Sequence, residues 1–175
     1  MKKLSLVGFF AFGLGLVFLI YRLVAPPTVE QKQQASYDTS TEQFIVADDS
    51  ETLSKMTSKQ AGIYFYGFPE CPWCQELLPI VNDALQGEKA SAYVVDIHGN
   101  SYSEEDAATL KTFYQLNVKQ KEVLVPFLVF INQEGQVKTH VGTIEGHNAK
   151  KEKMTKNQRE ELMKALRDLV IWSQS

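Results

Sequence analysis

The sequence predicts an α/β protein, in which helices flank a mixed central sheet, preceded by a separate apolar segment. Three apolar runs, at 62–66, 91–97 and 126–131, are continuous rather than alternating, as is typical of strands covered on both faces. Segments with helical spacing lie between these runs, and this alternation favours parallel strands joined by crossover helices. After the third run, the turn "NQEG" leads into a further strand at 136–141, so the sheet closes with an antiparallel hairpin.

Residues 1–25 are predicted to form a cytoplasmic tip and a transmembrane anchor. Two lysines precede an apolar run at 4–24. This run matches the roughly 20 residues of a membrane-spanning helix and exceeds the roughly 7–15 of a signal-peptide core. The best small-residue candidate for a cleavage site is Ala25, but Leu23 is bulky where the usual A-x-A pattern needs a small residue. A cleaved signal peptide and a buried globular helix remain as alternatives.

The lysines before the anchor predict that the N-terminus stays in the cytoplasm and that the rest of the chain lies outside. That localisation, at the cell membrane with an extracytoplasmic domain, permits disulfides. Residues 26–41 begin with two prolines and are otherwise mostly polar, which predicts a linker. Residues 42–175 form the predicted folded domain.

The charge pattern argues against a nucleic-acid partner. The chain carries 18 basic and 21 acidic side chains, a formal net charge of -3, whereas phosphate binding calls for a clustered basic excess. The densest basic stretch is Lys150, Lys151, Lys153 and Lys156, interrupted by Glu152. We interpret it as a solvated face near a helix start.

The first half of the domain is predicted to contain two strands and two helices. Residues 44–46 form a short strand, and the polar residues 48–50 begin a helix that continues to about residue 57. The apolar run at 62–66 is the second strand. A loop follows it, and then a helix from about 74 to 85.

The second half begins with a strand at 91–97. Ser103, with Asp106 three residues later, caps a helix that runs to about residue 116. After the hairpin, Thr155 and Gln158 form a second capping-box pair. The final helix places four apolar side chains on one face: Leu162, Leu166, Leu169 and Val170.

The stretch "CPWC" at 71–74 carries the predicted chemistry, and its two cysteines are the only ones in the chain. Cys71 lies where the helix begins, and the helix dipole and free backbone N–H groups favour its thiolate. Cys74 lies three residues later on the same helical face, so it can close a ring with Cys71 and release a mixed-disulfide partner. We therefore predict Cys71 as the attacking thiol, Cys74 as the resolving thiol, and no cofactor beyond this pair.

Two other roles for the cysteines are disfavoured by spacing. A zinc site needs four ligands, and the available pool is the two cysteines with His98, His140 and His147, whose spacing is not that of zinc motifs. A permanent structural disulfide would close a very small loop and so remove little chain entropy.

These features resemble the thioredoxin-like superfamily over about residues 41–172. The resemblance is carried by "CPWC" between a strand and a helix, by Pro79 inside that helix, and by "VPFLVFINQEGQVKTHVG" from Val125 onwards. It implies a thioredoxin fold and a cis peptide bond between Val125 and Pro126. It also implies that this loop lies against the cysteines, and that the backbone of Val125 pairs with the substrate chain.

Two features depart from the common pattern of that family. Phe65 stands where many thioredoxins have a buried aspartate, so proton exchange at Cys74 has to rely on water or another group. Pro72 and Trp73 replace the usual Gly-Pro, which resembles relatives with less reducing potentials. Trp73 is predicted either to contact apolar parts of the substrate or to pack within its loop.

The sequence thus predicts a membrane-anchored thiol-disulfide oxidoreductase whose partners are cysteine-containing secreted or surface proteins and peptides, together with a redox partner protein. Whether it forms, isomerises or reduces disulfides stays open. The anchor, stalk and "CPWC" domain also resemble membrane-anchored extracytoplasmic thioredoxins of Gram-positive bacteria, some of which accompany bacteriocin production. The alternative is a non-catalytic peptide-binding module for secretion, with a groove near Val125 and Pro126.

Overall fold

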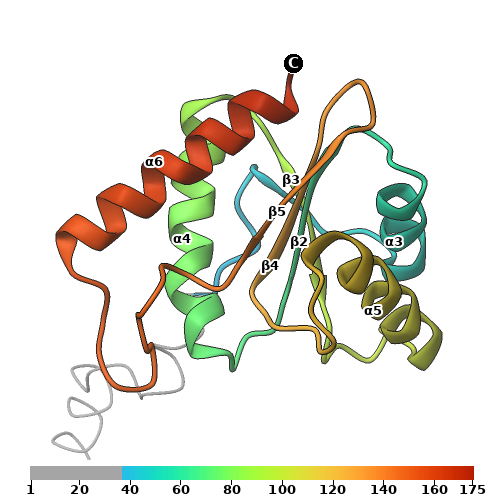
Figure 1. The fold of residues 1–175 in the computed structure, drawn as a ribbon, viewed down its shortest axis with the longest axis horizontal. Coiled ribbons are helices and arrows are strands. Elements are labelled where there is room, and N and C mark those ends of the chain that lie inside the picture. Colours follow the sequence, from blue (N-terminus) through green and yellow to red (C-terminus); the bar gives the residue numbers. More distant parts are fainter. Residues whose placement is uncertain (1–36) are drawn as a thin grey trace, which may run out of the picture. The chain divides into compact units, whose positions relative to one another are not determined.

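A computed structural model describes residues 37–175, and helices and strands alternate along them as predicted (Figure 1). The predicted anchor at 1–25 and most of the predicted linker at 26–41 lie outside the described residues. Within residues 37–175, none of the helices combines the length and the apolar character that a membrane span requires.

The centre of the domain is a five-stranded mixed sheet in the order β1-β3-β2-β4-β5. Its strands are β1 (Phe44–Ile45), β2 (Gly62–Gly67), β3 (Ala92–Asp96), β4 (Phe127–Ile131) and β5 (Val137–Val141). Strands β1, β3 and β2 are parallel, whereas β4 is antiparallel to β2 and β5 is antiparallel to β4. The predicted mixed sheet is confirmed, and β2 is its central strand.

Four helices cover the two faces of this sheet. They are α3 (Asp49–Thr57), α4 (Pro72–Gly87), α5 (Glu104–Val118) and α6 (Lys156–Ser173). Helices α4 and α6 lie on one face, and α3 and α5 lie on the other (Figure 1). Both predicted capping boxes are present, one at the start of α5 and one at the start of α6.

Strand β2 shows why its apolar run is unbroken. Successive side chains of a strand point to opposite faces of the sheet. Ile63 and Phe65 belong to the core under α4 and α6, whereas Tyr64 and Tyr66 belong to the core under α3 and α5. Both sets are buried, so the prediction that helices cover this strand on both faces is confirmed.

The folded unit begins earlier than the predicted boundary at residue 42. Tyr37 is only 8% exposed, and its ring meets that of Phe65 edge-on, with 6.3 Å between the ring centroids. The hydroxyl of Thr41 donates a hydrogen bond to Asn82 Oδ1 at 2.6 Å. The last residues of the predicted linker are therefore packed on the domain, because partners in β2 and α4 hold a stretch whose own composition is polar.

Further features match the resemblance noted in the sequence. The peptide bond between Val125 and Pro126 is cis, as the resemblance implies. Pro79 lies inside α4, and "CPWC" follows the central strand. Together with the mixed sheet between two pairs of helices, these features make the fold thioredoxin-like.

Candidate active site

Cys71 occupies the N-terminus of α4, where the sequence places it. It is the N-cap residue of that helix, and Pro72 takes the first helical position, where a missing N–H costs little. The backbone N–H of Cys74 donates to the Cys71 sulfur at 3.3 Å. The loop from β2 is fixed by Gln75, whose side-chain amide donates to the carbonyl of Pro69 at 2.7 Å. The first turn of α4 thus holds the Cys71 sulfur at the positive end of the helix.

The surroundings of Cys71 favour its thiolate. A hydrogen bond from the Cys74 thiol, opposed by burial, lowers the pKa of Cys71 from 9.0 to about 7, and the backbone N–H groups of Cys74 and Trp73 and the charge of Lys150 contribute in the same direction. The side chain retains a 4% exposed fraction, whereas that of Cys74 is fully buried. Of the two residues, Cys71 is therefore the one whose thiol ionises near neutral pH and the less deeply buried one.

Cys74 has the opposite properties. The hydrogen bond that it shares with Cys71 and its own burial raise the pKa of Cys74 well above its ordinary range. Its sulfur packs where Gly67 has no side chain: a Cβ on Gly67 would lie 3.0 Å from the sulfur and 2.7 Å from the Phe65 ring. Cys74 therefore stays a protonated, sheltered thiol until its neighbour reacts, which suits a resolving thiol.

The three residues predicted to bind substrate lie around this pair. The carbonyl oxygen of Val125 is 3.9 Å from the Cys71 sulfur, although 54 residues separate the two in the chain. Pro126 is buried, and its carbonyl accepts a hydrogen bond from the backbone N–H of Gly142 at 2.8 Å. Trp73 is half-buried and packs against the core under α4 and α6. Their roles toward a substrate stay predictions.

The basic stretch that we interpreted as a solvated face takes part in the site. Lys150 is exposed, but its ammonium lies 5.7 Å from the centroid of the Trp73 ring and contributes to the low pKa of Cys71. The sequence pattern missed this because Lys150 reaches the cysteines only through the fold of the segment between β5 and α6.

Replacing Lys150 with alanine is expected to raise the pKa of Cys71 slightly, by about 0.3, because an exposed charge acts weakly through water. The measurement is the pH profile of Cys71 alkylation in the reduced chain. Lys151→Ala is the matched control, since Lys151 is an exposed neighbour that is not among the main causes of the pKa shift of Cys71. High salt should bring the Lys150→Ala and unmodified profiles together; a difference that persists in high salt would contradict the electrostatic explanation.

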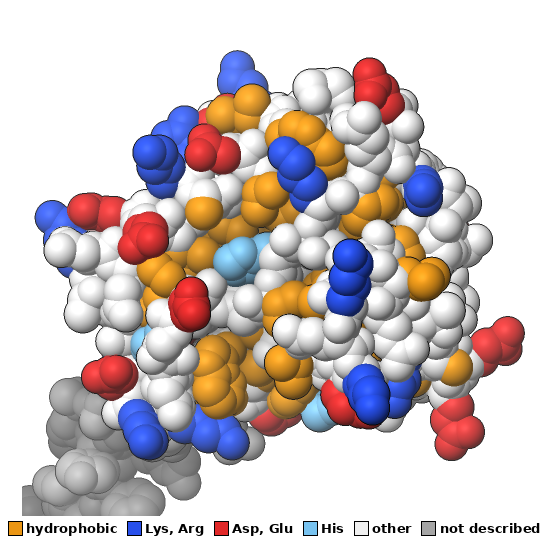
Figure 2. Space-filling model, viewed as in Figure 1, with side chains coloured by type: hydrophobic (Ala, Val, Ile, Leu, Met, Phe, Trp, Pro, Cys, Tyr) orange, Lys and Arg blue, Asp and Glu red, His pale blue; other side chains and the backbone are white. Residues whose placement is uncertain are grey.

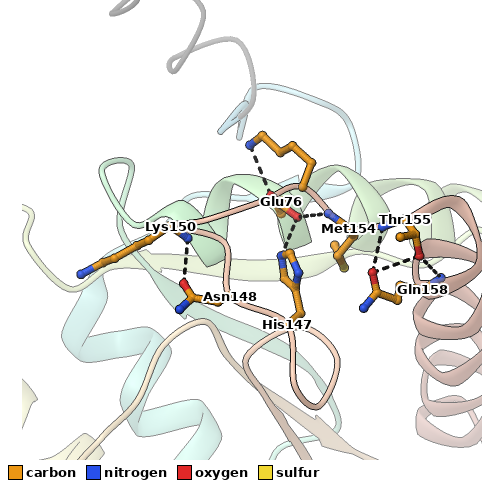
Figure 3. A network of polar contacts seen from close by, with 8 residues as sticks. Glu76, His147, Asn148, Lys150, Met154, Thr155 and Gln158 are labelled. Carbon is orange, nitrogen blue, oxygen red and sulfur yellow. Dashed lines mark hydrogen bonds and ion pairs between the residues drawn. The ribbon is translucent and has the colours of Figure 1, made fainter.

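The buried carboxylate of Glu76 fastens the segment between β5 and α6 to α4 (Figure 3). Glu76 Oε2 lies 3.1 Å from His147 Nε2 and accepts a hydrogen bond from the backbone N–H of Met154, also at 3.1 Å. The ammonium of Lys153 lies 3.3 Å from Glu76 Oε1. Glu76 thus holds the chain on both sides of Lys150, at His147 and at Met154. Nothing in the local sequence predicts a pairing across 71 residues.

The histidines of the zinc alternative are engaged in separate places. His98 stacks on Phe68 with 3.8 Å between ring centroids, His140 Nε2 lies 3.1 Å from the carbonyl oxygen of Gly142, and His147 pairs with Glu76. Over residues 37–175, no three histidine, cysteine or carboxylate side chains are grouped as metal ligands.

On the face drawn in Figure 2, basic and acidic side chains are interspersed.

Comparison with models of known protein families finds no match. Comparison with curated proteins finds none either. Among solved structures, thioredoxin O2 from Arabidopsis thaliana in its oxidized state is similar, with 20% identity and a TM-score of 0.42, over 71% of this chain and 94% of that one. With identity and TM-score this low, the function of this chain has to be inferred from its own residues.

Proposed function

We propose that this protein is a membrane-anchored, extracytoplasmic thiol-disulfide oxidoreductase. The observation that carries the proposal is the asymmetry of the two cysteines. Cys71 has a pKa lowered to about 7 at a helix N-terminus, and Cys74 is a buried thiol within hydrogen-bonding reach of it. A thiolate at neutral pH with a protonated partner thiol beside it is what two-step disulfide exchange requires.

The two steps follow from these positions. In the reducing direction the Cys71 thiolate attacks one sulfur of a substrate disulfide, the substrate S–S bond breaks, and the departing sulfur takes up a proton. Cys74 then loses its proton and attacks Cys71, and the Cys71–Cys74 bond forms as the electron pair leaves on the remaining substrate sulfur, which is protonated in turn. The substrate disulfide is reduced to two thiols and the protein pair is oxidised; the reverse sequence oxidises a substrate.

The stabilised thiolate also bears on direction. Groups that stabilise the Cys71 thiolate stabilise the dithiol form of the protein, which makes its disulfide a stronger oxidant. The Pro72-Trp73 dipeptide resembles that of relatives with less reducing potentials, and on this ground we propose a couple less reducing than that of thioredoxin, re-oxidised by a partner protein. Equilibration of the chain with glutathione buffers measures this potential. Trapping the thiols in cells with an alkylating reagent identifies the direction: mostly disulfide indicates an oxidase, and mostly dithiol a reductase.

The proposed location and substrates rest on the sequence. The lysine-led apolar run at 4–24 supports a single-pass anchor with the domain outside, where cysteine-containing secreted or surface proteins and peptides are the available substrates. Small secreted peptides that need disulfides, such as those of bacteriocin systems, belong to this class.

Replacing Cys74 with serine tests the function. The variant keeps the attacking thiol but cannot complete the second step, so it should accumulate mixed disulfides with its substrates. Non-reducing gels reveal these adducts, and mass spectrometry identifies the trapped proteins. Cys71→Ser is the matched control and should form none. If Cys71→Ser retains full biological function, the chain acts as a non-catalytic binding module and the oxidoreductase proposal is wrong.

A further inference from the structure

In the second step of the proposed exchange Cys74 has to become a thiolate, and its surroundings disfavour that form. The sulfur is fully buried, and burial disfavours the thiolate that must form there. The backbone N–H groups of Phe68 and Cys74 favour the charged form, but the pKa of Cys74 remains raised because the hydrogen bond shared with Cys71 and burial outweigh them. A further hydrogen-bond donor near this sulfur would speed its ionisation.

Tyr37 brings such a donor to the same part of the core. Its ring packs edge-on against Phe65, and the Phe65 ring and the Cys74 sulfur are the two groups that crowd the missing side chain of Gly67. Tyr37, Phe65, Cys71 and Cys74 all belong to the core under α4 and α6. The Tyr37 hydroxyl is buried and has no hydrogen-bond partner among residues 37–175.

Burial and nearby negative charge both keep this hydroxyl protonated. Burial raises the pKa of Tyr37 well above its ordinary range, and negative charge on Cys74 raises it further, ahead of the charges of Asp96, Cys71 and Glu70. The phenol therefore keeps its proton at any working pH. It can donate a hydrogen bond to a nearby anion but cannot act as a base.

We propose that Tyr37 is a positioning residue for the resolving step, whose hydroxyl donates a hydrogen bond to the Cys74 sulfur as that sulfur becomes a thiolate. The Cys74 proton passes to solvent and the leaving substrate sulfur takes up a proton, so the phenol is unchanged at the end of the step. The inference rests on the proposed oxidoreductase function. It assigns a role to a hydroxyl that otherwise lies buried without a partner, an arrangement that costs stability.

The experiment resolves the two chemical steps on the reduced full chain in mild detergent. Rapid mixing with 5,5′-dithiobis(2-nitrobenzoate) releases one coloured thiolate when Cys71 attacks and a second when Cys74 resolves the mixed disulfide. The rate of the first release depends on reagent concentration and that of the second does not. In Tyr37→Phe we expect the first step to be unchanged. The second should slow about tenfold, with its pH midpoint raised by about one unit, because a hydrogen bond to a charged group is lost.

Matched variants separate the hydroxyl from the packing of the ring. Tyr66→Phe is the control, since the Tyr66 hydroxyl is also buried without a partner among the described residues but lies in the core under α3 and α5. Tyr37→Leu removes the ring as well and reports the cost of lost packing. The first step serves as an internal monitor that the site is intact in every variant.

The outcomes distinguish this inference from the function on which it rests. A second release in Tyr37→Phe with the rate and pH midpoint of the unmodified chain overturns the role of Tyr37 and leaves the oxidoreductase function standing. The same holds if Tyr66→Phe slows the second step equally, because the effect would then not be specific to this hydroxyl. If the unmodified chain shows no second release, the cysteines do not form a redox couple and the proposed function itself is wrong.

Discussion

Alkylation of Cys71 in the reduced native chain should reach half its maximal rate near pH 7, whereas an ordinary cysteine does so near pH 9. At pH 7 about half of the Cys71 side chains would then be thiolate, against about one per cent of unperturbed thiols. The intrinsic nucleophilicity of a thiolate falls with its pKa, so the rate itself rises less than the thiolate fraction. The pH midpoint is therefore the quantity to measure.

Two substitutions at Cys74 test the largest cause of that low midpoint, the hydrogen bond donated by the Cys74 thiol. Each leaves Cys71 as the single cysteine, so iodoacetamide reports on one sulfur. Cys74→Ala removes the donor and should move the midpoint toward pH 9, whereas Cys74→Ser supplies a hydroxyl and should keep it low. A midpoint near pH 9 in the native chain with both cysteines would show that the helix terminus does not activate Cys71.

The same pKa shift makes the stability of the dithiol form depend on pH. The pKa of Cys71 is about 7 in the folded chain and near 9.0 when unfolded. Between these values the unfolded state binds more protons, so this group stabilises the fold increasingly as pH rises through that window and loses its contribution as pH falls through 7. Cys74 acts in the opposite direction above its unfolded pKa, because its folded pKa is raised. Denaturant midpoints of the reduced chain measured from pH 6 to 9 check this sign.

Glu76→Ala is expected to lower the free energy of unfolding by about 3 kcal/mol, because it leaves two buried polar groups without their partner. The Met154 N–H and the His147 ring nitrogen both lose the carboxylate that now lies 3.1 Å from each of them. The loss affects His147 more than Met154, because the other ring nitrogen of His147 is already buried without a partner among the described residues.

Denaturant unfolding of the reduced chain, followed by tryptophan fluorescence, measures this effect. Glu76→Gln retains an acceptor oxygen and should cost less than alanine. Glu160→Ala is the exposed control, because its i,i+4 pair with Lys156 at 3.6 Å is solvated on both sides and should contribute below about 0.5 kcal/mol. Equal losses in Glu76→Ala and Glu160→Ala would contradict the structural role of the buried pair.

The sequence predicts the framework of this domain because its signals are local. Continuous apolar runs locate the strands at 62–66, 91–97 and 126–131, and the capping boxes at Ser103 and Thr155 locate two helix starts to the residue. The position of Cys71 at the N-terminus of α4 follows from the same kind of signal. Propensity, capping and burial act over a few residues, so one sequence is enough to read them.

The residues that sequence reasoning missed act through long-range contacts. Tyr37 lies in a polar stretch of the sequence, and only its packing on Phe65 in the structure shows that it belongs to the core. Glu76 belongs to an amphipathic helix, where a carboxylate is ordinary. Its partner His147 lies 71 residues away in the chain, so the sequence does not predict the contact. Lys150 reads as one of several solvated lysines, and only the fold brings it to Cys71. Each pairing is set by how the elements dock, which local periodicity does not encode.

The place of β2 in the sheet has a consequence for the order in which its strands open locally. The strand that leads to the cysteines has β3 on one side and β4 on the other, while the margins of the sheet are the two-residue β1 and the β5 ribbon. Sub-global opening that begins at a margin has to cross a neighbouring strand before it loosens β2. Either edge of the sheet can therefore fray while the strand that leads to the cysteines keeps its amides protected from exchange.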